Sequence, residues 1–238
     1  MISHSQTRVC LTVDTEQDCP PFMSSFRGIE EGLDLLLQLL QQEDVSATFF
    51  TTGDVAIKYP PAIEKIVLAG HELGCHGQTH RSFMTMDEHA AEDEIRSASD
   101  ALRKFASVTS FRAPYLAFPN RFLGLLEDQA FLLDSSQAKY KLSYYRSADP
   151  TTLKRVPASM TSSVLRLPRW VREPWMSALS SPIVLLVHPW EFVDLRRERL
   201  RWDCRFNTGR VALDRLRSVL QFLKGRNAVF LPIRELAA

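Results

Sequence analysis

The chain has 238 residues, 45% of them apolar, which is enough for one large α/β domain or two small ones. Its formal net charge of +1 gives no electrostatic case for binding nucleic acid. The longest apolar run, Ile183 to Val187, is far too short for a transmembrane helix. Because no C-x-x-C spacing occurs, we expect reduced thiols and no disulfide framework from the four cysteines, Cys10, Cys19, Cys75 and Cys204.

The first eight residues lack a basic stretch followed by an apolar run, so they predict no signal peptide. Four arginines between residues 196 and 201 are interleaved with acids. We interpret them first as a solvated face, and second as a patch for an anionic ligand or a membrane surface. A cytoplasmic location is favoured, with peripheral attachment to a membrane as the alternative.

Strand and helix patterns alternate through the first half of the chain. Residues 8–14 alternate around apolar side chains and predict a buried strand that ends in an acid. Leucines at helical spacing predict an amphipathic helix over residues 28–42. β-Branched and aromatic residues predict a strand over 45–52, and paired prolines open a helix over 60–69. A third strand is expected over residues 71–76.

The second half continues this alternation less regularly. A long helix is expected over residues 86–105, with Asp87 as its N-cap. Residues 135–182 contain several prolines and serines, and we expect them to leave the barrel as an excursion. A hairpin between residues 153–156 and 164–167 is the expected structure there. The other expected elements are strands over 109–112, 131–134, 183–187 and 228–231 and a helix over 210–224.

Alternating strands and helices predict an α/β fold of βαβ units with a mostly parallel sheet. We expect a single distorted (β/α) barrel of seven strands in one domain over residues 1–238, because no linker or repeat divides the chain. The C-terminal ends of barrel strands converge on one face, where active sites are built. Polar residues lie at the ends of five expected strands: Asp14, His76, Arg112, Asp134 and His188.

Histidines and carboxylates near these strand ends predict a metal site. His76 and His80 are four residues apart, a spacing that brings two side chains to one side of a turn. A neutral imidazole binds a divalent ion without burying a charge. The acidic segment with Asp14, Glu16 and Asp18 could supply a third ligand. Two histidines and a carboxylate, with a position open to water, form the catalytic type of zinc site.

The same segments supply candidates for an acid and a base. Asp14 and Glu16 are two apart in a strand, so both project to one face, and one can bind metal while the other acts as base. Arg112 is expected to pair with the base carboxylate. His188 is the natural acid. A metal that acidifies water and polarises a carbonyl, together with these groups, is suited to hydrolysis of an amide or ester.

Five short motifs occur in order along the chain: Thr12-Val13-Asp14-Thr15-Glu16, the pair His76 and His80, Arg112-Ala113-Pro114-Tyr115, Leu133-Asp134-Ser135-Ser136 and Leu186-Val187-His188. On these motifs the chain resembles the polysaccharide deacetylases of carbohydrate esterase family 4, the NodB-homology family, from about Val9 to Leu236. The third motif matches without change and the fourth more loosely. The extension His188-Pro189-Trp190-Glu191 looks like the branch that includes deacetylases acting on intracellular or lipid-linked sugars.

The resemblance implies a divalent metal ion, Zn²⁺ first, with Co²⁺, Ni²⁺ or Mn²⁺ as alternatives. The metal ligands it implies are Glu16, His76 and His80. The first motif departs from the common form of two adjacent aspartates, because Thr15 follows Asp14. Glu16 is therefore placed ahead of Asp18 as the carboxylate ligand.

The resemblance also implies the catalytic roles. Asp14 would be the base, and Arg112 would orient it. Asp134 would orient Arg112 or His188. The backbone N–H of Tyr115 would stabilise the oxyanion, and His188 would protonate the departing amine.

The function expected on these grounds is metal-dependent removal of an N-acetyl group from an amino sugar, with metal-activated water as the nucleophile. The substrate would be an N-acylated sugar that is small, nucleotide-linked or lipid-linked. The alternatives are a deformylase of a lipid-linked amino sugar and a hydrolase of another linear or cyclic amide. A hypothesis of a different class is a carbohydrate-binding protein with impaired catalysis, for which the altered first motif is the only support.

Overall fold

β1 (Thr7–Thr15), the strand expected at residues 8–14, pairs with three other strands of the sheet. It pairs in parallel with β2 (Ala47–Thr51) on one side and with β7 (Ile183–Val187) on the other. β8 (Ala228–Phe230) pairs in parallel with the first residues of β1, before the stretch that pairs with β2. The structure is a computed structural model that describes residues 6–142, 144 and 151–237, so most of the segment used to judge a signal peptide lies outside the described residues.

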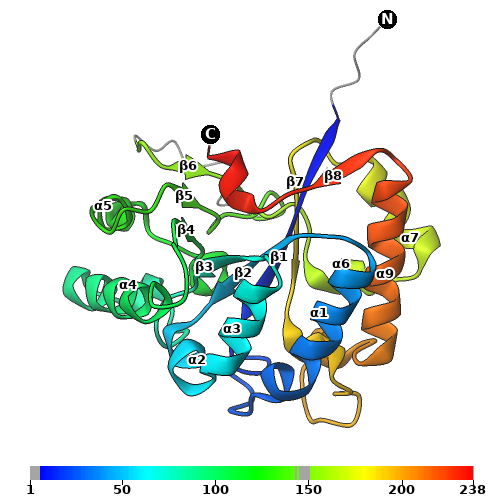
Figure 1. Cartoon of the computed structure of the whole chain (residues 1–238), viewed down its shortest axis with the longest axis horizontal. Helices are drawn as coiled ribbons and strands as arrows, with labels where there is room; N and C mark the ends of the chain where they lie inside the picture. The colour runs from blue at the N-terminus through cyan, green and yellow to red at the C-terminus, as the bar shows by residue number, and fades with distance from the viewer. Residues whose placement is uncertain (1–5, 143, 145–150, 238) are drawn as a thin grey trace, which may run out of the picture.

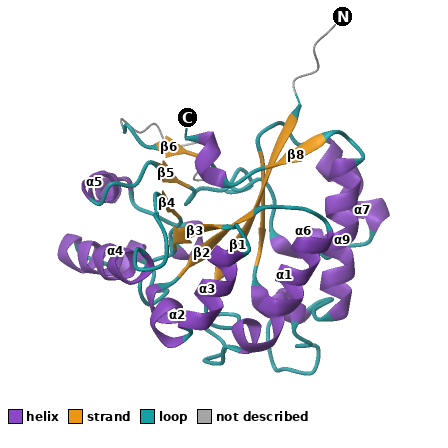
Figure 2. Ribbon diagram, viewed as in Figure 1, coloured by secondary structure: helices purple, strands orange, loops and turns teal. Residues whose placement is uncertain are grey.

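Seven parallel strands follow one another in the order β6-β5-β4-β3-β2-β1-β7 and curl into a half-barrel, with β8 added on β1. Figure 1 and Figure 2 show these strands in the middle of the molecule with the helices around them. The expected distorted, mostly parallel (β/α) barrel is therefore confirmed. The remaining strands are β3 (Glu72–Cys75), β4 (Ser110–Phe111), β5 (Leu133–Asp134) and β6 (Lys154–Arg155).

The hairpin expected in the irregular region was wrong. Its first half contains β6, but β6 pairs in parallel with β5 as a strand of the barrel. Its second half begins in the helix α6 (Ser162–Leu165) and is not a strand, because a short apolar run fits a buried helix as well as a strand. Beyond β6, Met160 forms a parallel bridge with Leu185 of β7, so this segment reaches the opposite end of the sheet.

Four of the helices match expected elements. The first begins with a π-helical turn (Gly28–Gly32) and continues as α1 (Leu33–Gln42). The N-cap of α4 is Asp87, whose carboxylate accepts a hydrogen bond from the Ala90 N–H at 2.8 Å. No helix in the described part of the chain is long and apolar enough to cross a bilayer. The α-helices not yet given are α2 (Gly53–Lys58), α3 (Pro60–Leu68), α4 (Glu88–Leu102), α5 (Leu123–Asp128), α7 (Arg169–Ser177), α8 (Trp202–Arg205) and α9 (Arg210–Lys224).

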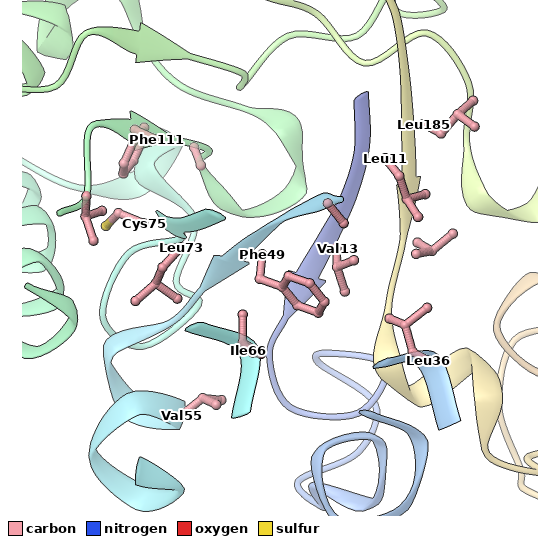
Figure 3. Close-up of a cluster of buried hydrophobic side chains, with 14 of the residues drawn as sticks. Leu11, Val13, Leu36, Phe49, Val55, Ile66, Leu73, Cys75, Phe111 and Leu185 are labelled. Carbon is pink, nitrogen blue, oxygen red and sulfur yellow. The ribbon is translucent and has the colours of Figure 1, made fainter. Parts of the chain in front are cut away.

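The main core lies between the sheet and the helices. Val13 of β1 and Phe49 of β2 face Leu36 of α1 and Ile66 of α3 in the buried cluster of Figure 3. All four side chains are fully or almost fully buried, and burial of this kind contributes about 1.5–3 kcal/mol for each large side chain. The core therefore fixes which face of each strand points outward to the helices.

The alternate residues of these strands point to the inside of the barrel. Cys10 of β1 and Phe50 of β2 belong to a second buried cluster, separate from the main core. Because side chains alternate along a strand, Thr12 and Asp14 share the face of Cys10. The packing of the outer face thus directs the carboxylate of Asp14 into the barrel.

A close approach between the π-helical turn and the helical turn Pro189–Phe192 requires a glycine at position 28. A Cβ there would lie 2.5 Å from the backbone N of Trp190 and 2.9 Å from Oδ1 of Asp18. We expect Gly28→Ala to lower the free energy of unfolding by about 1–3 kcal/mol, because backbone must move to admit the methyl group. Urea denaturation measures this change.

Gly124→Ala is the matched control for this prediction. Gly124 lies in α5, and a Cβ added there would have no neighbouring atom within 4 Å, so alanine should raise the free energy of unfolding by about 0.5 kcal/mol. Equal effects of the two substitutions would contradict the close approach at Gly28.

Candidate active site

The structure brings Glu16, His76 and His80 together at the C-terminal ends of β1 and β3. Glu16 Oε2 lies 3.2 Å from His76 Nε2 and 2.5 Å from His80 Nε2. All three side chains are buried, and their ligand atoms lie within 4.8 Å of one another. Two imidazoles and one carboxylate at this separation could hold a single divalent ion.

Hydrogen bonding supports a cation at the centre of this cluster. His76 Nδ1 lies 2.7 Å from the carbonyl oxygen of Arg112, which can only accept, so Nδ1 carries the hydrogen. Nε2 is then the nitrogen that faces the carboxylate of Glu16, and a proton or a metal ion can lie between these two atoms. His80 Nδ1 is buried with no partner among the described residues. The donor set fits a divalent metal with three protein ligands.

The pKa values of these groups agree with a site for positive charge. Burial opposes the charged form of Glu16, but His80 and His76 hold the pKa of its carboxyl well below the usual range. Burial also opposes the charged form of His76, while Asp14 and Glu16 raise its pKa. The cluster therefore stabilises a carboxylate that is paired with a cation.

Asp18, the alternative carboxylate ligand, is used elsewhere. It is fully buried and accepts hydrogen bonds from Ser25 Oγ at 2.7 Å and from the backbone N–H groups of Arg27 and Gly28, both at 2.8 Å. These contacts cap the start of the first helix. Of the two carboxylates left open by the sequence, the structure places Glu16 beside the histidines.

Asp14 lies beside this cluster and is held by Arg112. Arg112 Nη1 donates to Asp14 Oδ1 at 2.7 Å and to Thr12 Oγ1 at 2.8 Å, and the guanidinium lies 4.2 Å from the centre of the Phe50 ring. Asp14 Oδ2 is 3.8 Å from His76 Nε2. One carboxylate oxygen is thus fixed by arginine while the other faces the candidate metal ligands.

The structure corrects the role expected of Asp134. Its carboxylate accepts from Arg155 Nε at 3.0 Å and from the backbone N–H of Ser136 at 2.9 Å. Burial raises the pKa of Asp134 despite its ion pair with Arg155. Arg112 instead donates to the hydroxyl of Ser135 at 2.9 Å. The residue after Asp134 therefore holds Arg112.

His188 is oriented by Glu191, a contact that the sequence did not lead us to expect. His188 Nδ1 lies 2.7 Å from Glu191 Oε1, and the other carboxylate oxygen of Glu191 is 3.2 Å from Arg166 Nε. His188 Nε2 lies 3.8 Å from Glu16 Oε1, and its ring stacks on Trp190 with a centroid distance of 4.8 Å. The ring therefore presents Nε2 toward the metal ligands.

The candidate base Asp14, the three candidate metal ligands and His188 all line one open cavity of about 250 Å³. Tyr115 stands at its edge, with its ring 4.8 Å from the ring of His80 and with φ of 60°, in the left-handed region. Such strained backbone in a non-glycine residue is common at functional sites. The cavity is lined by Asp14, Glu16, Cys19, Pro20, His76, His80, Tyr115, Leu116, Tyr140, Lys141, Thr161, Ser162, Leu186, His188, Trp190 and Cys204.

Comparison with known sequences identifies the family. The sequence model described as polysaccharide deacetylase matches residues 3–131, which is more than half of the chain. The chain belongs to the polysaccharide deacetylase family. The matched region contains the acidic motif, both histidines and Arg112, whereas His188 and Glu191 lie beyond it.

The chain is also similar to a known deacetylase in sequence and to two solved structures in fold. The peptidoglycan deacetylase of Helicobacter pylori is 30% identical over 125 residues, which cover 50% of this chain and 42% of the relative. The chain thus matches about two fifths of that relative's length. A carbohydrate esterase family 4 pseudoenzyme from Bacillus anthracis shares the fold with a TM-score of 0.68 at 18% identity, over 98% of this chain and 66% of that one. A family 4 carbohydrate esterase from Streptomyces lividans gives 0.65 at 18% identity, over 94% and 91%.

We expect the stability of the candidate site to depend on pH, and this dependence can be measured without substrate. Burial would lower the pKa of His188, but Glu191 and Glu16 raise it to about 9. Because the folded protein favours protonated His188, this group stabilises the fold fully at pH values below 6.5, its pKa in the unfolded chain. The stabilisation is lost as pH rises through about 9. For chelator-treated protein we expect a loss on the order of 2–3 kcal/mol over this range, measured by urea denaturation.

Glu191→Gln is the comparison variant for this pH dependence. It removes the negative charge but keeps an acceptor for His188 Nδ1–H, so the difference between wild type and variant should shrink between pH 6.5 and 9. Parallel curves for the two proteins would show that Glu191 does not raise the pKa of His188.

Proposed function

We propose that this chain is a metal-dependent hydrolase that removes the N-acetyl group from an amino sugar. The products would be acetate and a free amine. The observation that carries the proposal is the placement of a candidate base and a candidate acid around one metal-binding cluster. Asp14 Oδ2 lies 3.8 Å from His76 Nε2, and His188 Nε2 lies 3.8 Å from Glu16 Oε1.

Asp14 takes the proton of the attacking water. Arg112 holds one of its oxygens at 2.7 Å, which leaves the other free to accept. A divalent ion held by Glu16, His76 and His80 would acidify water and polarise the acyl oxygen. The fixed orientation of Asp14 supplies the base without a rearrangement during the reaction.

His188 gives a proton to the nitrogen of the departing amine. The hydrogen bond to Glu191 raises the pKa of His188, which favours the protonated form that a general acid requires. The 2.7 Å contact with Glu191 directs Nε2 into the cavity. The backbone N–H of Tyr115 is assigned to the oxyanion, which is supported by the strained backbone at φ 60° beside His80.

For the substrate we propose a chemical class and no single compound. The name of the Helicobacter pylori relative, peptidoglycan deacetylase, supports an acetylated sugar as the substrate. The cavity is open to solvent and has Tyr140 and Lys141 in its wall, which suits a sugar that carries a further group. We propose a small, nucleotide-linked or lipid-linked sugar, with Zn²⁺ as the preferred ion.

A panel of substrates tests the proposal. Purified protein with added Zn²⁺ is incubated with N-acetylated and N-formylated sugars, each free, nucleotide-linked and lipid-linked, and acetate and formate are measured separately. Release of acetate at a rate that a chelator abolishes is the expected result. Release of formate alone would select the deformylase. Sugar binding without release of either acid would select the carbohydrate-binding protein.

A further inference from the structure

Two cysteines that the proposed reaction does not use lie together in the wall of the cavity. Cys19 follows β1, and Cys204 lies in α8, far along the chain. Both line the cavity, and both pack in a small apolar cluster with Trp190. Cys204 packs against the cluster that contains Cys19, so the two side chains lie in one small part of the cavity wall. Cys19 is 2% exposed and Cys204 is half-buried, which gives a reagent access from the side of Cys204.

The other two cysteines have a different environment. Cys10 in β1 and Cys75 in β3 are fully buried, and desolvation raises the pKa of each thiol to about 12. Such thiols react slowly, because the thiolate is the nucleophile, and Cys204 and burial also raise the pKa of Cys19. The neighbouring Cys19 lowers the pKa of the Cys204 thiol below its usual value. Cys204 is therefore the thiol expected to react first.

We propose that Cys19 and Cys204 form a dithiol site that a hydroperoxide oxidises to a disulfide across the wall of the cavity. The Cys204 thiolate attacks one oxygen of hydrogen peroxide, the O–O bond breaks and, with the thiol proton, one water leaves. The resulting sulfenic acid is attacked by the sulfur of Cys19, the S–O bond breaks and a second water leaves. One peroxide is reduced by two electrons, and two thiols become one disulfide.

The bond would join two segments that both contribute to the cavity. Cys19 lies three residues after Glu16 in the loop that leaves β1. The carbonyl of Cys204 accepts from Arg166 Nη1 at 3.3 Å, and Arg166 also pairs with Glu191. The disulfide would therefore connect the loop of a candidate metal ligand to the residues that orient His188.

The test is peptide mapping of the full-length protein. Freshly reduced protein receives a few-fold molar excess of hydrogen peroxide, free thiols are blocked with N-ethylmaleimide, and an Asp-specific protease digests it without reductant. Cleavage before Asp18 and Asp203 separates Cys19 and Cys204 from Cys10. We expect mass spectrometry to find the linked pair of peptides that begin at these residues, with Cys10 and Cys75 recovered as blocked thiols.

Stability supplies a second measurement. A disulfide that suits the native fold restricts the unfolded chain, so the oxidised protein should have a Tm roughly 5–10 °C higher, and reduction should reverse the rise. Cys204→Ser should lose both the linked peptide and the change in Tm, whereas Cys10→Ser should keep both. The proposal is overturned if Cys204 is recovered only as blocked thiol or sulfinic acid, if the linkage appears only in denatured protein, or if oxidation lowers the Tm. None of these outcomes depends on the proposed hydrolase activity.

Discussion

Asp14→Asn should lower turnover by roughly 10²–10⁴-fold while substrate still binds, because an amide cannot take the proton of the attacking water. Asparagine has almost the same shape as aspartate, and its carbonyl oxygen can still accept from Arg112 Nη1, which lies 2.7 Å from the native carboxylate. KM should therefore change much less than kcat. The measurement is acetate release under saturating conditions with the best substrate of the panel, using a fixed excess of Zn²⁺.

Two controls separate this effect from damage to the fold. Asp14 is buried beside a fully buried arginine, so loss of its charge lowers stability, and the Tm of the variant must remain above the assay temperature. Asp34→Asn makes the same chemical change at a half-exposed residue that pairs with Lys65, and it should leave kcat unchanged. Full turnover by a folded Asp14→Asn protein would remove Asp14 from the role of base.

The regular elements of the fold could be predicted because their patterns are long. α9 runs from Arg210 to Lys224, as its helical spacing predicts, and the strand ends that carry Asp14, His76 and His188 were correctly placed. α2 (Gly53–Lys58) was missed, since six residues are too few to show a helical period. Its N-cap, Thr52, which accepts from the Val55 N–H at 3.4 Å, was the available signal.

The residues that orient the candidate catalytic groups were harder to predict. β5 has only two residues, and a shift of one residue exchanges the two faces of a strand. The sequence therefore could not decide whether Asp134 or Ser135 faces Arg112, and the structure selects Ser135. The spacing of three between His188 and Glu191 was a usable signal, because it is the spacing of a capping box.

The choice between Glu16 and Asp18 also depended on contacts outside the acidic segment. Both acids lie just after β1, only two residues apart, so the sequence around them does not distinguish their roles. The start of the first helix presents the N–H groups of Arg27 and Gly28, and these bind Asp18. Only the folded arrangement shows which carboxylate remains for the histidines.

Removal of a candidate metal ligand should strongly weaken metal binding by the protein. His76→Ala should bind Zn²⁺ at least ~10²-fold more weakly than wild type, since loss of even an outer-shell partner costs 10–100-fold in affinity. Its Nε2 lies 3.2 Å from Glu16, and its Nδ1 is held by the Arg112 carbonyl, so no neighbouring group can replace it without moving. Metal analysis after equilibrium dialysis against a graded Zn²⁺ buffer measures the change directly, without any substrate.

Three matched variants make this measurement specific. Glu16→Ala should lose metal as His76→Ala does, because its carboxylate completes the ligand set. Asp18→Ala should retain metal but lower the free energy of unfolding by about 2–4 kcal/mol, because three donors lose their acceptor. His89→Ala, at an exposed position, should change neither quantity. Retained metal in Glu16→Ala together with lost metal in Asp18→Ala would reverse the assignment of the carboxylate ligand and require the loop after β1 to rearrange when metal binds.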